Sequence, residues 1–254
     1  HNIFGTGYET ALGCELAGGN STGISGEDNA VQRYVQCVDN IDMSETLAVV
    51  ILNSPAYAGT TYFGYTNQTK VVEFAIAYCP VIYDLQSESF RQVLVHEAVG
   101  HGFAKLEDEY AYQENGTISS KEIKNVQYLQ TLGWAQNVDF TSDPSQVLWS
   151  AFLNDNRYVS EKLGVFEGAC TYIKGAYRPS EESMMNSNNE GFNAPSRKAI
   201  YDKIMERSLG KQMSYEEFAV FDLQNKSQTR SAKPTVGPSK PFTRPHFVNR
   251  MLDK

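Results

Sequence analysis

Two apolar segments in the first hundred residues have the pattern of buried strands. LAVVIL at 47–52 is continuous and β-branched, and VVEFAIAYC at 71–79 is a second apolar run. A helix is expected near 29–38, and another is expected to begin after Ser87, a favourable N-cap residue. The second helix has apolar residues at core-facing spacing: Phe90, Val93, Leu94 and Ala98. The first half of the chain therefore predicts an α/β unit.

Beyond residue 110 the pattern changes to helices joined by long irregular connections. Helices are expected within 119–134 and 196–207, and this half has no convincing pair of strands. We therefore expect two lobes. The upper lobe, about 1–104, would contain a twisted mixed sheet, and the lower lobe, about 105–222, would be largely helical and irregular.

The segment 223–254 differs from both lobes, because it is rich in Pro, Ser and basic residues. Such a composition predicts an extended strap or linker rather than a packed element. The preceding residues, 1–222, are then expected to form one domain. In the chain of 254 residues, 41% are hydrophobic, which is enough to build a sizeable core.

The charge balance excludes several classes of partner. The formal net charge is −8, which disfavours nucleic acid and anionic membranes. The longest apolar run, Leu47–Leu52, is far shorter than the roughly 20 residues of a membrane-spanning helix. The sequence begins at His1 without a leader, so we expect a mature or trimmed form in which any export signal is missing.

The spacing of the four cysteines argues against a metal cluster bound by thiolates. They are widely separated and never occur as CxxC. They would allow three disulfide pairings, and buried free thiols are the alternative.

Two of the four histidines fall within the string HEAVGH, at positions 96 and 101. Side chains five residues apart on a regular α-helix point about 140° away from each other. A π-type turn, which closes from i to i+5, would bring them together, and Gly100 would tolerate the distorted backbone. The similar string HExxGH is found in the dipeptidyl peptidase III family. We therefore predict one π-type turn between Val95 and Gly102.

Two imidazoles and a carboxylate are the ligands that catalytic zinc uses, with one position left for water. Glu97, next to His96, would act as the general base. A turn at Gly102 would bring acids of the LEDEY stretch toward the metal. The spacing leaves three candidates for the third ligand: Glu107, Asp108 and Glu109. The alternative interpretation is a pair of ordinary, partly buried histidines followed by a solvated acidic loop.

The string HEAVGHGFAKLEDEY resembles the signature of the immunoglobulin A peptidase family of zinc metallopeptidases, in the branch with HExxGH spacing. VVILNSPAYAG, VDFTSDPSQVLW, FEGACTYIKGAYRPSEESMMNSN and FNAPSRKAIYDKIM resemble further blocks of that family, so the similarity covers roughly 1–222. The resemblance implies a metzincin-like zincin fold. Its implied site is as follows: one catalytic zinc ion on His96, His101 and Asp108, the base Glu97, the supporting residue Glu109, and a methionine turn at Met185.

The resemblance also implies a secreted or surface-anchored endopeptidase that acts on peptides or proteins. A host immunoglobulin or another secreted protein is the expected substrate. An extended peptide would add itself to the sheet edge near NSPAYAG through main-chain hydrogen bonds. The expected substrate-side residues are Asn53, Tyr57, Gly59 and Tyr177, although Tyr57 and Gly59 also suit an ordinary turn.

Two rival functions remain open at this point. The chain could be a weak or inactive zinc-fold module that binds a host protein or glycan, but such a module would have no need of Glu97. An exopeptidase like the HExxGH group would take its third ligand from a glutamate on a separate helix, and the DEY stretch explains the acids better. We therefore predict a zinc metalloendopeptidase.

Overall fold

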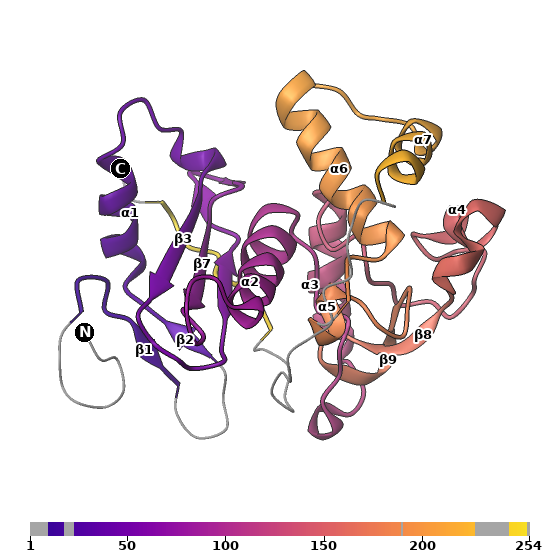
Figure 1. The fold of residues 1–254 in the computed structure, drawn as a ribbon, viewed down its shortest axis with the longest axis horizontal. Helices are drawn as coiled ribbons and strands as arrows, with labels where there is room; N and C mark the ends of the chain where they lie inside the picture. Colours follow the sequence, from indigo (N-terminus) through magenta and orange to yellow (C-terminus); the bar gives the residue numbers. More distant parts are fainter. Residues whose placement is uncertain (1–9, 18–22, 189, 227–243, 253–254) are drawn as a thin grey trace. The chain divides into compact units, whose positions relative to one another are not determined.

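The computed structural model describes residues 10–17, 23–188, 190–226 and 244–252. The chain forms two compact units, one of His1–Phe103 with Pro234–Lys254 and the other of Ala104–Lys233. The architecture is mixed α/β and includes a mixed sheet, as the sequence predicts (Figure 1). Within the described ranges, no helix is both long and apolar enough to cross a membrane.

The centre of the first unit is a four-stranded sheet with the order β10-β4-β7-β3. β3 is parallel to β7, β4 is antiparallel to β7, and β10 is parallel to β4. The four strands are β3 (Leu47–Leu52), β4 (Thr60–Phe63), β7 (Ala75–Pro80) and β10 (His246–Phe247). The short pairs β1 (Glu15–Leu16) with β2 (Ile24–Ser25) and β5 (Thr66–Asn67) with β6 (Lys70–Val71) lie outside this sheet.

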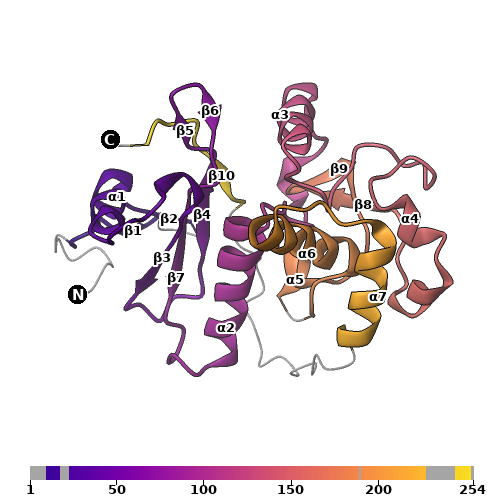
Figure 2. The ribbon, with the colours of Figure 1, turned by 90° about the horizontal axis from the view of Figure 1, so that it is seen from above.

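Helices cover both faces of this sheet (Figure 2). Side chains alternate along β7, so Ile76 and Tyr78 join the cluster that contains Val31 of α1, whereas Ala77 and Cys79 pack with α2 and the following helix. All six residues of β7 are buried, as its continuous apolar sequence requires. The helical segments of this unit are α1 (Asp28–Gln36), η1 (Met43–Glu45), α2 (Glu88–Leu94) and η2 (Val95–Phe103).

Strand β3 is only half buried, which corrects the expectation of a fully buried strand. Val50 and Leu52 enter the core, but Val49 and Ile51 are exposed. Side chains alternate between the two faces of a strand, so Val49 and Ile51 share one face, and this face is uncovered at the end of the sheet where β3 lies.

The second unit is mostly helical. Its buried core includes Trp149, Phe152, Tyr158 and Phe218. The long α6 begins at the N-cap Asn193, whose side chain accepts the Ser196 N–H. The helices are η3 (Gln113–Asn115), α3 (Ser120–Thr131), α4 (Ser150–Leu153), η4 (Asn156–Glu161), α5 (Met184–Ser187), α6 (Ala194–Leu209) and α7 (Tyr215–Asn225).

This unit also contains a β-hairpin, so the expectation of no strand pair beyond residue 110 was wrong. β8 (Phe166–Ala169) pairs antiparallel with β9 (Tyr172–Arg178). Both turn residues, Cys170 and Thr171, have positive φ angles of 52° and 69°. A two-residue hairpin turn requires such angles, but they are usually supplied by Asn or Gly. The turn therefore had no recognisable sequence signal.

The structure joins none of the four cysteines, Cys14, Cys37, Cys79 and Cys170, in a disulfide. Cys37 is exposed and the other three are buried. Burial raises the pKa of the Cys79 thiol well above its usual value, and the nearby charge of Glu97 adds to this effect. Of the two alternatives that the sequence allowed, the structure therefore shows thiols without disulfides.

Candidate metal centre

Both histidines lie on η2, a π-helix over Val95–Phe103 that directly continues α2. The i to i+5 closure of a π-helix brings residues five apart onto one side. The His96 and His101 rings have centroids 4.6 Å apart, and their Nε2 atoms are separated by 2.9 Å. The predicted π-type turn is thus confirmed, and it extends over 9 residues rather than a single turn.

The end of this helix differs from the prediction. Gly102 lies inside the π-helix, and the left-handed residue that follows is Lys105, with φ 55°. Gly102 has a different reason to lack a side chain, because a Cβ there would lie 2.6 Å from Cδ1 of Leu47 on β3. The glycine therefore allows close packing of helix on sheet.

His96, His101 and Asp108 form a buried cluster that could hold a metal ion. Each offers one ligand atom, and these atoms all lie within 4.8 Å of one another. Two ligands of a tetrahedral zinc ion, each bonded at about 2.1 Å, are about 3.4 Å apart. The 2.9 Å between the two Nε2 atoms is close to this separation. Two imidazoles with one carboxylate therefore match the ligand types of zinc, and their ligand atoms are near enough together to reach one metal ion.

Glu97 is fully buried, and strand β4 holds its carboxylate. The Thr61 hydroxyl lies 2.7 Å from Glu97 Oε2 and 3.0 Å from the Glu97 backbone oxygen. A Cβ at Gly59 would lie only 2.6 Å from Oε1 of the same carboxylate. Gly59 and Thr61 therefore fix the position of Glu97 from one side.

Asp108 lies on a segment whose backbone is held by hydrogen bonds to three other parts of the chain. Its backbone oxygen accepts the Cys170 N–H of the β8–β9 turn at 2.9 Å. The neighbouring Glu107 exchanges two hydrogen bonds with the Asn137 side chain, at 2.9 Å and 2.8 Å. The Glu109 N–H donates to the Met185 oxygen at 2.8 Å. These bonds fix the backbone of the Asp108 segment.

The carboxylate of Glu109 is completely buried and accepts four side-chain hydrogen bonds. The donors are Asn137 at 2.9 Å, Ser183 at 2.6 Å, Asn193 at 2.8 Å and Ser196 at 3.2 Å. Burial raises the pKa of this carboxyl, and the four hydrogen bonds act in the opposite direction. Glu109 therefore joins the Asp108 segment to the N-terminus of α6 and to the residue that precedes α5.

Met185, the expected methionine of the turn, is fully buried on the short helix α5. Its backbone oxygen accepts the Glu109 N–H, so the methionine is bonded to the residue next to Asp108.

The four expected substrate-side residues lie in different surroundings. Gly59 abuts the Glu97 carboxylate, whereas Tyr57 packs against the cluster of Ala77, Phe90 and Val93. Asn53 is exposed at the end of β3. Tyr177 lies on β9, exchanges backbone hydrogen bonds with Asp139 and packs against the core of the second unit. Gly59 is therefore the expected substrate-side residue that lies against the predicted catalytic base.

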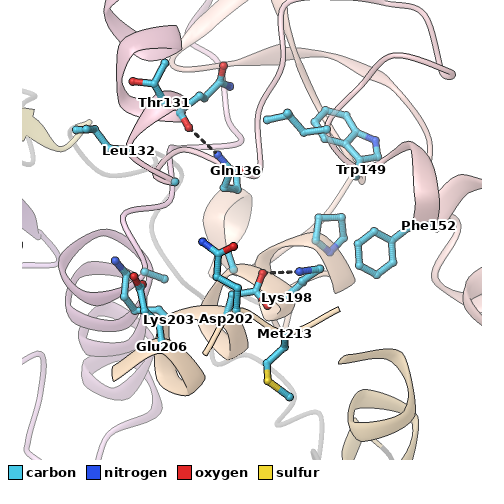
Figure 3. A pocket seen from close by; sticks show the side chains of 17 residues that line it. Thr131, Leu132, Gln136, Trp149, Phe152, Lys198, Asp202, Lys203, Glu206 and Met213 are labelled. Atoms are coloured by element: carbon cyan, nitrogen blue, oxygen red, sulfur yellow. Dashed lines mark hydrogen bonds and ion pairs between the residues drawn. The ribbon is translucent and has the colours of Figure 1, made fainter. Parts of the chain in front are cut away.

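The second unit also contains a pocket of about 680 Å³. Figure 3 shows the Lys198–Asp202 ion pair of α6 on its wall, together with the apolar rings of Trp149 and Phe152. Burial raises the pKa of Asp202, while Lys198 lowers it. None of the residues predicted for the site lines this pocket.

Several residues that hold the site had no signal in the sequence. Thr61 is one hydroxyl in the strand TTYF, and Asn137 lies in an irregular connection. Asn193 and Ser196 have the ordinary pattern of a helix start, in which Asn193 accepts the Ser196 N–H. Their second role, as donors to Glu109, depends on tertiary contacts.

The fold and the site together define an α/β protein with a candidate metal cluster of two histidines and one aspartate, next to a buried glutamate. The sequence model described as IgA Peptidase M64 matches residues 22–160 and 150–204. The chain belongs to this peptidase family, as the resemblance in its motifs implies. A search among curated proteins gave no match.

Proposed function

We propose that the protein is a zinc-dependent endopeptidase with a metzincin-like arrangement. The observation that carries this proposal is the buried cluster of His96, His101 and Asp108 on a chain that belongs to a peptidase family. Glu97 next to His96 supports the proposal of an endopeptidase further. A peptidase needs a carboxylate beside the metal as a general base, whereas a site that only holds the metal does not.

His96, His101 and Asp108 would hold the metal. When bound, zinc would supply Lewis acidity, which polarises the peptide carbonyl and acidifies a water molecule. Glu97 would accept a proton from the attacking water and later deliver it to the leaving amine. The Thr61 hydroxyl orients the Glu97 carboxylate for this work, and Gly59 leaves room for it.

The proposed substrates are extracellular proteins, with a host immunoglobulin as one candidate, and the proposed location is outside the cytoplasm. A peptide whose scissile bond faces Glu97 would run along β4, because Gly59 and Thr61 at the start of this strand touch that carboxylate. Tyr57, Asn53 and Tyr177 remain proposed substrate contacts, and Glu109 and Met185 remain proposed supports of the metal site.

The test combines metal analysis with digestion of a peptide library by the purified protein. We expect about one zinc ion per chain and specific cleavage. Glu97→Gln should retain zinc and lose about 10²- to 10⁴-fold in rate, because glutamine cannot accept the proton. Glu114→Gln, at an exposed position of η3, is the matched control and should cleave normally.

A Glu97→Gln variant as active as the unmodified chain would contradict this proposal. Binding of an intact protein or glycan without cleavage of any peptide would instead favour the alternative of an inactive binding module.

A further inference from the structure

The C-terminal segment 244–252 is part of the first unit and lies along β4. His246 pairs with Tyr62 and Phe247 with Phe63 in a parallel ladder. The Val248 N–H donates to the Phe63 oxygen at 2.8 Å. The edge of β4 from Tyr62 onward is therefore already paired with the protein's own chain.

Hydrogen bonds continue this pairing beyond β4. Thr66 donates its N–H to the Arg250 oxygen at 2.6 Å and accepts the Leu252 N–H at 2.9 Å. The guanidinium of Arg250 also contacts the buried Asp28 carboxylate at 2.8 Å, and the same carboxylate oxygen accepts the Tyr65 hydroxyl. Backbone hydrogen bonds to Phe63 and Thr66, together with the Arg250–Asp28 ion pair, hold the segment from Val248 to Leu252.

Side-chain packing makes the segment an integral part of the unit. Val248 and Leu252 pack against the core cluster around Ile76 and Tyr78. The His246 ring stacks on Tyr62, with centroids 4.8 Å apart. Phe247 packs edge-on against Phe63 and occupies the space where Gly64 has no side chain. A weakly attached tail would not pack partly buried apolar side chains against the core in this way.

The other end of β4 lies at the proposed catalytic base. Thr61 bonds the Glu97 carboxylate, and Gly59 abuts it. The two residues that touch Glu97 lie one and three positions before Tyr62, and a strand advances about 3.3 Å per residue, so the paired edge begins within about 10 Å of the base along the strand. The edge of β4 that is left for a substrate next to Glu97 is therefore short.

We propose that the segment 244–252 sets the length of substrate that β4 can hold, an inference that rests on the proposed peptidase function. A peptide pairs with β4 only up to Thr61, because the segment holds the edge from Tyr62 onward. On one side of the scissile bond, the substrate extends along β4 toward Tyr62. Substrate residues that extend past Thr61 on this side gain no main-chain hydrogen bonds from β4. Binding on that side therefore depends on a short stretch of substrate.

The test measures peptide affinity in the Glu97→Gln background, so that cleavage is not required. The probes are fluorescent peptides from unfolded β-casein, lengthened one residue at a time from each end, and the readout is anisotropy. With the segment in place, affinity should stop rising after a few residues on one side. In a chain that ends at residue 243, each further residue on that side should gain about two- to tenfold in affinity.

A second pair of variants guards against misfolding of the shortened chain, which circular dichroism would reveal. Val248→Pro removes the N–H that Phe63 accepts, whereas Val248→Ala keeps it. We expect the proline variant to bind longer peptides more tightly than the alanine variant. Hydrogen exchange can be measured on the Glu97→Gln protein with the segment 244–252 unaltered. The Val248 and Leu252 amides should stay protected from exchange when the protein is saturated with peptide.

The outcomes separate this inference from the proposed function. The same dependence on peptide length with and without the segment, or loss of amide protection when peptide binds, would overturn the inference. If the length dependence appears as expected but the unmodified protein cleaves nothing, the peptidase proposal alone fails. If no casein peptide binds to either protein, both are overturned.

Discussion

Replacing Gly59 by alanine should impair catalysis without touching a metal ligand. The added Cβ would lie 2.6 Å from Glu97 Oε1, 2.7 Å from Cγ and 2.9 Å from Cδ. Ordinary contacts of this type begin at about 3.4 Å, so the carboxylate would have to move by roughly 0.8 Å. Thr61 holds the opposite oxygen at 2.7 Å, so this movement would also disturb that hydrogen bond.

The size of the effect follows from this displacement. A shift of about 1 Å in a catalytic group can lower the rate about 10²-fold. We therefore expect Gly59→Ala to lose about 10- to 100-fold in kcat/KM, which corresponds to roughly 1.4 to 2.7 kcal/mol in the barrier. Overpacking should also lower the free energy of unfolding by about 1 to 3 kcal/mol. Zinc content should be unchanged, because the crowded group is Glu97.

The assay compares kcat/KM on a cleaved peptide, zinc content and urea unfolding. Gly191→Ala is the matched control, since a Cβ there meets nothing within 4 Å and its backbone is not left-handed. It should behave as the unmodified protein. Normal kcat/KM in folded Gly59→Ala would refute the argument that Gly59 and Thr61 position Glu97 for proton transfer.

Two further predictions concern the ligand set and pH. Asp108→Ala should weaken zinc binding by more than about 100-fold, measured by competition with a chelator, and unchanged affinity would remove Asp108 from the ligands. The hydrogen bond from Arg157, with help from Tyr215, lowers the pKa of Asp155 from 3.8 to about 2. Because the folded-state pKa is depressed, this stabilisation is present above pH 4 and is lost as the pH falls toward 2. Asp155→Asn should flatten that part of the stability profile in urea unfolding, and an identical profile would contradict the assignment.

The sequence by itself determined the local features of this protein. The apolar runs predicted the α/β class, and Ser87 predicted the start of α2, where its hydroxyl accepts the Phe90 N–H at 3.1 Å. The five-residue spacing of His96 and His101 predicted a π-type turn, because only that register brings both side chains to one side. These predictions depend on residues that are near one another in sequence.

Tertiary structure decided how the site is held. Spacing alone could not choose among Glu107, Asp108 and Glu109, because their directions depend on bonds to Asn137, Cys170 and Met185 far along the chain. Compositional rules predicted a strap at the C-terminus but gave no sign that His246 and Phe247 would pair with β4. Strand pairing over such a distance depends on a free sheet edge and on packing against the core. The sequence of a two-residue strand indicates neither a free sheet edge nor a core to pack against. Only the folded chain could therefore reveal that β10 pairs with β4.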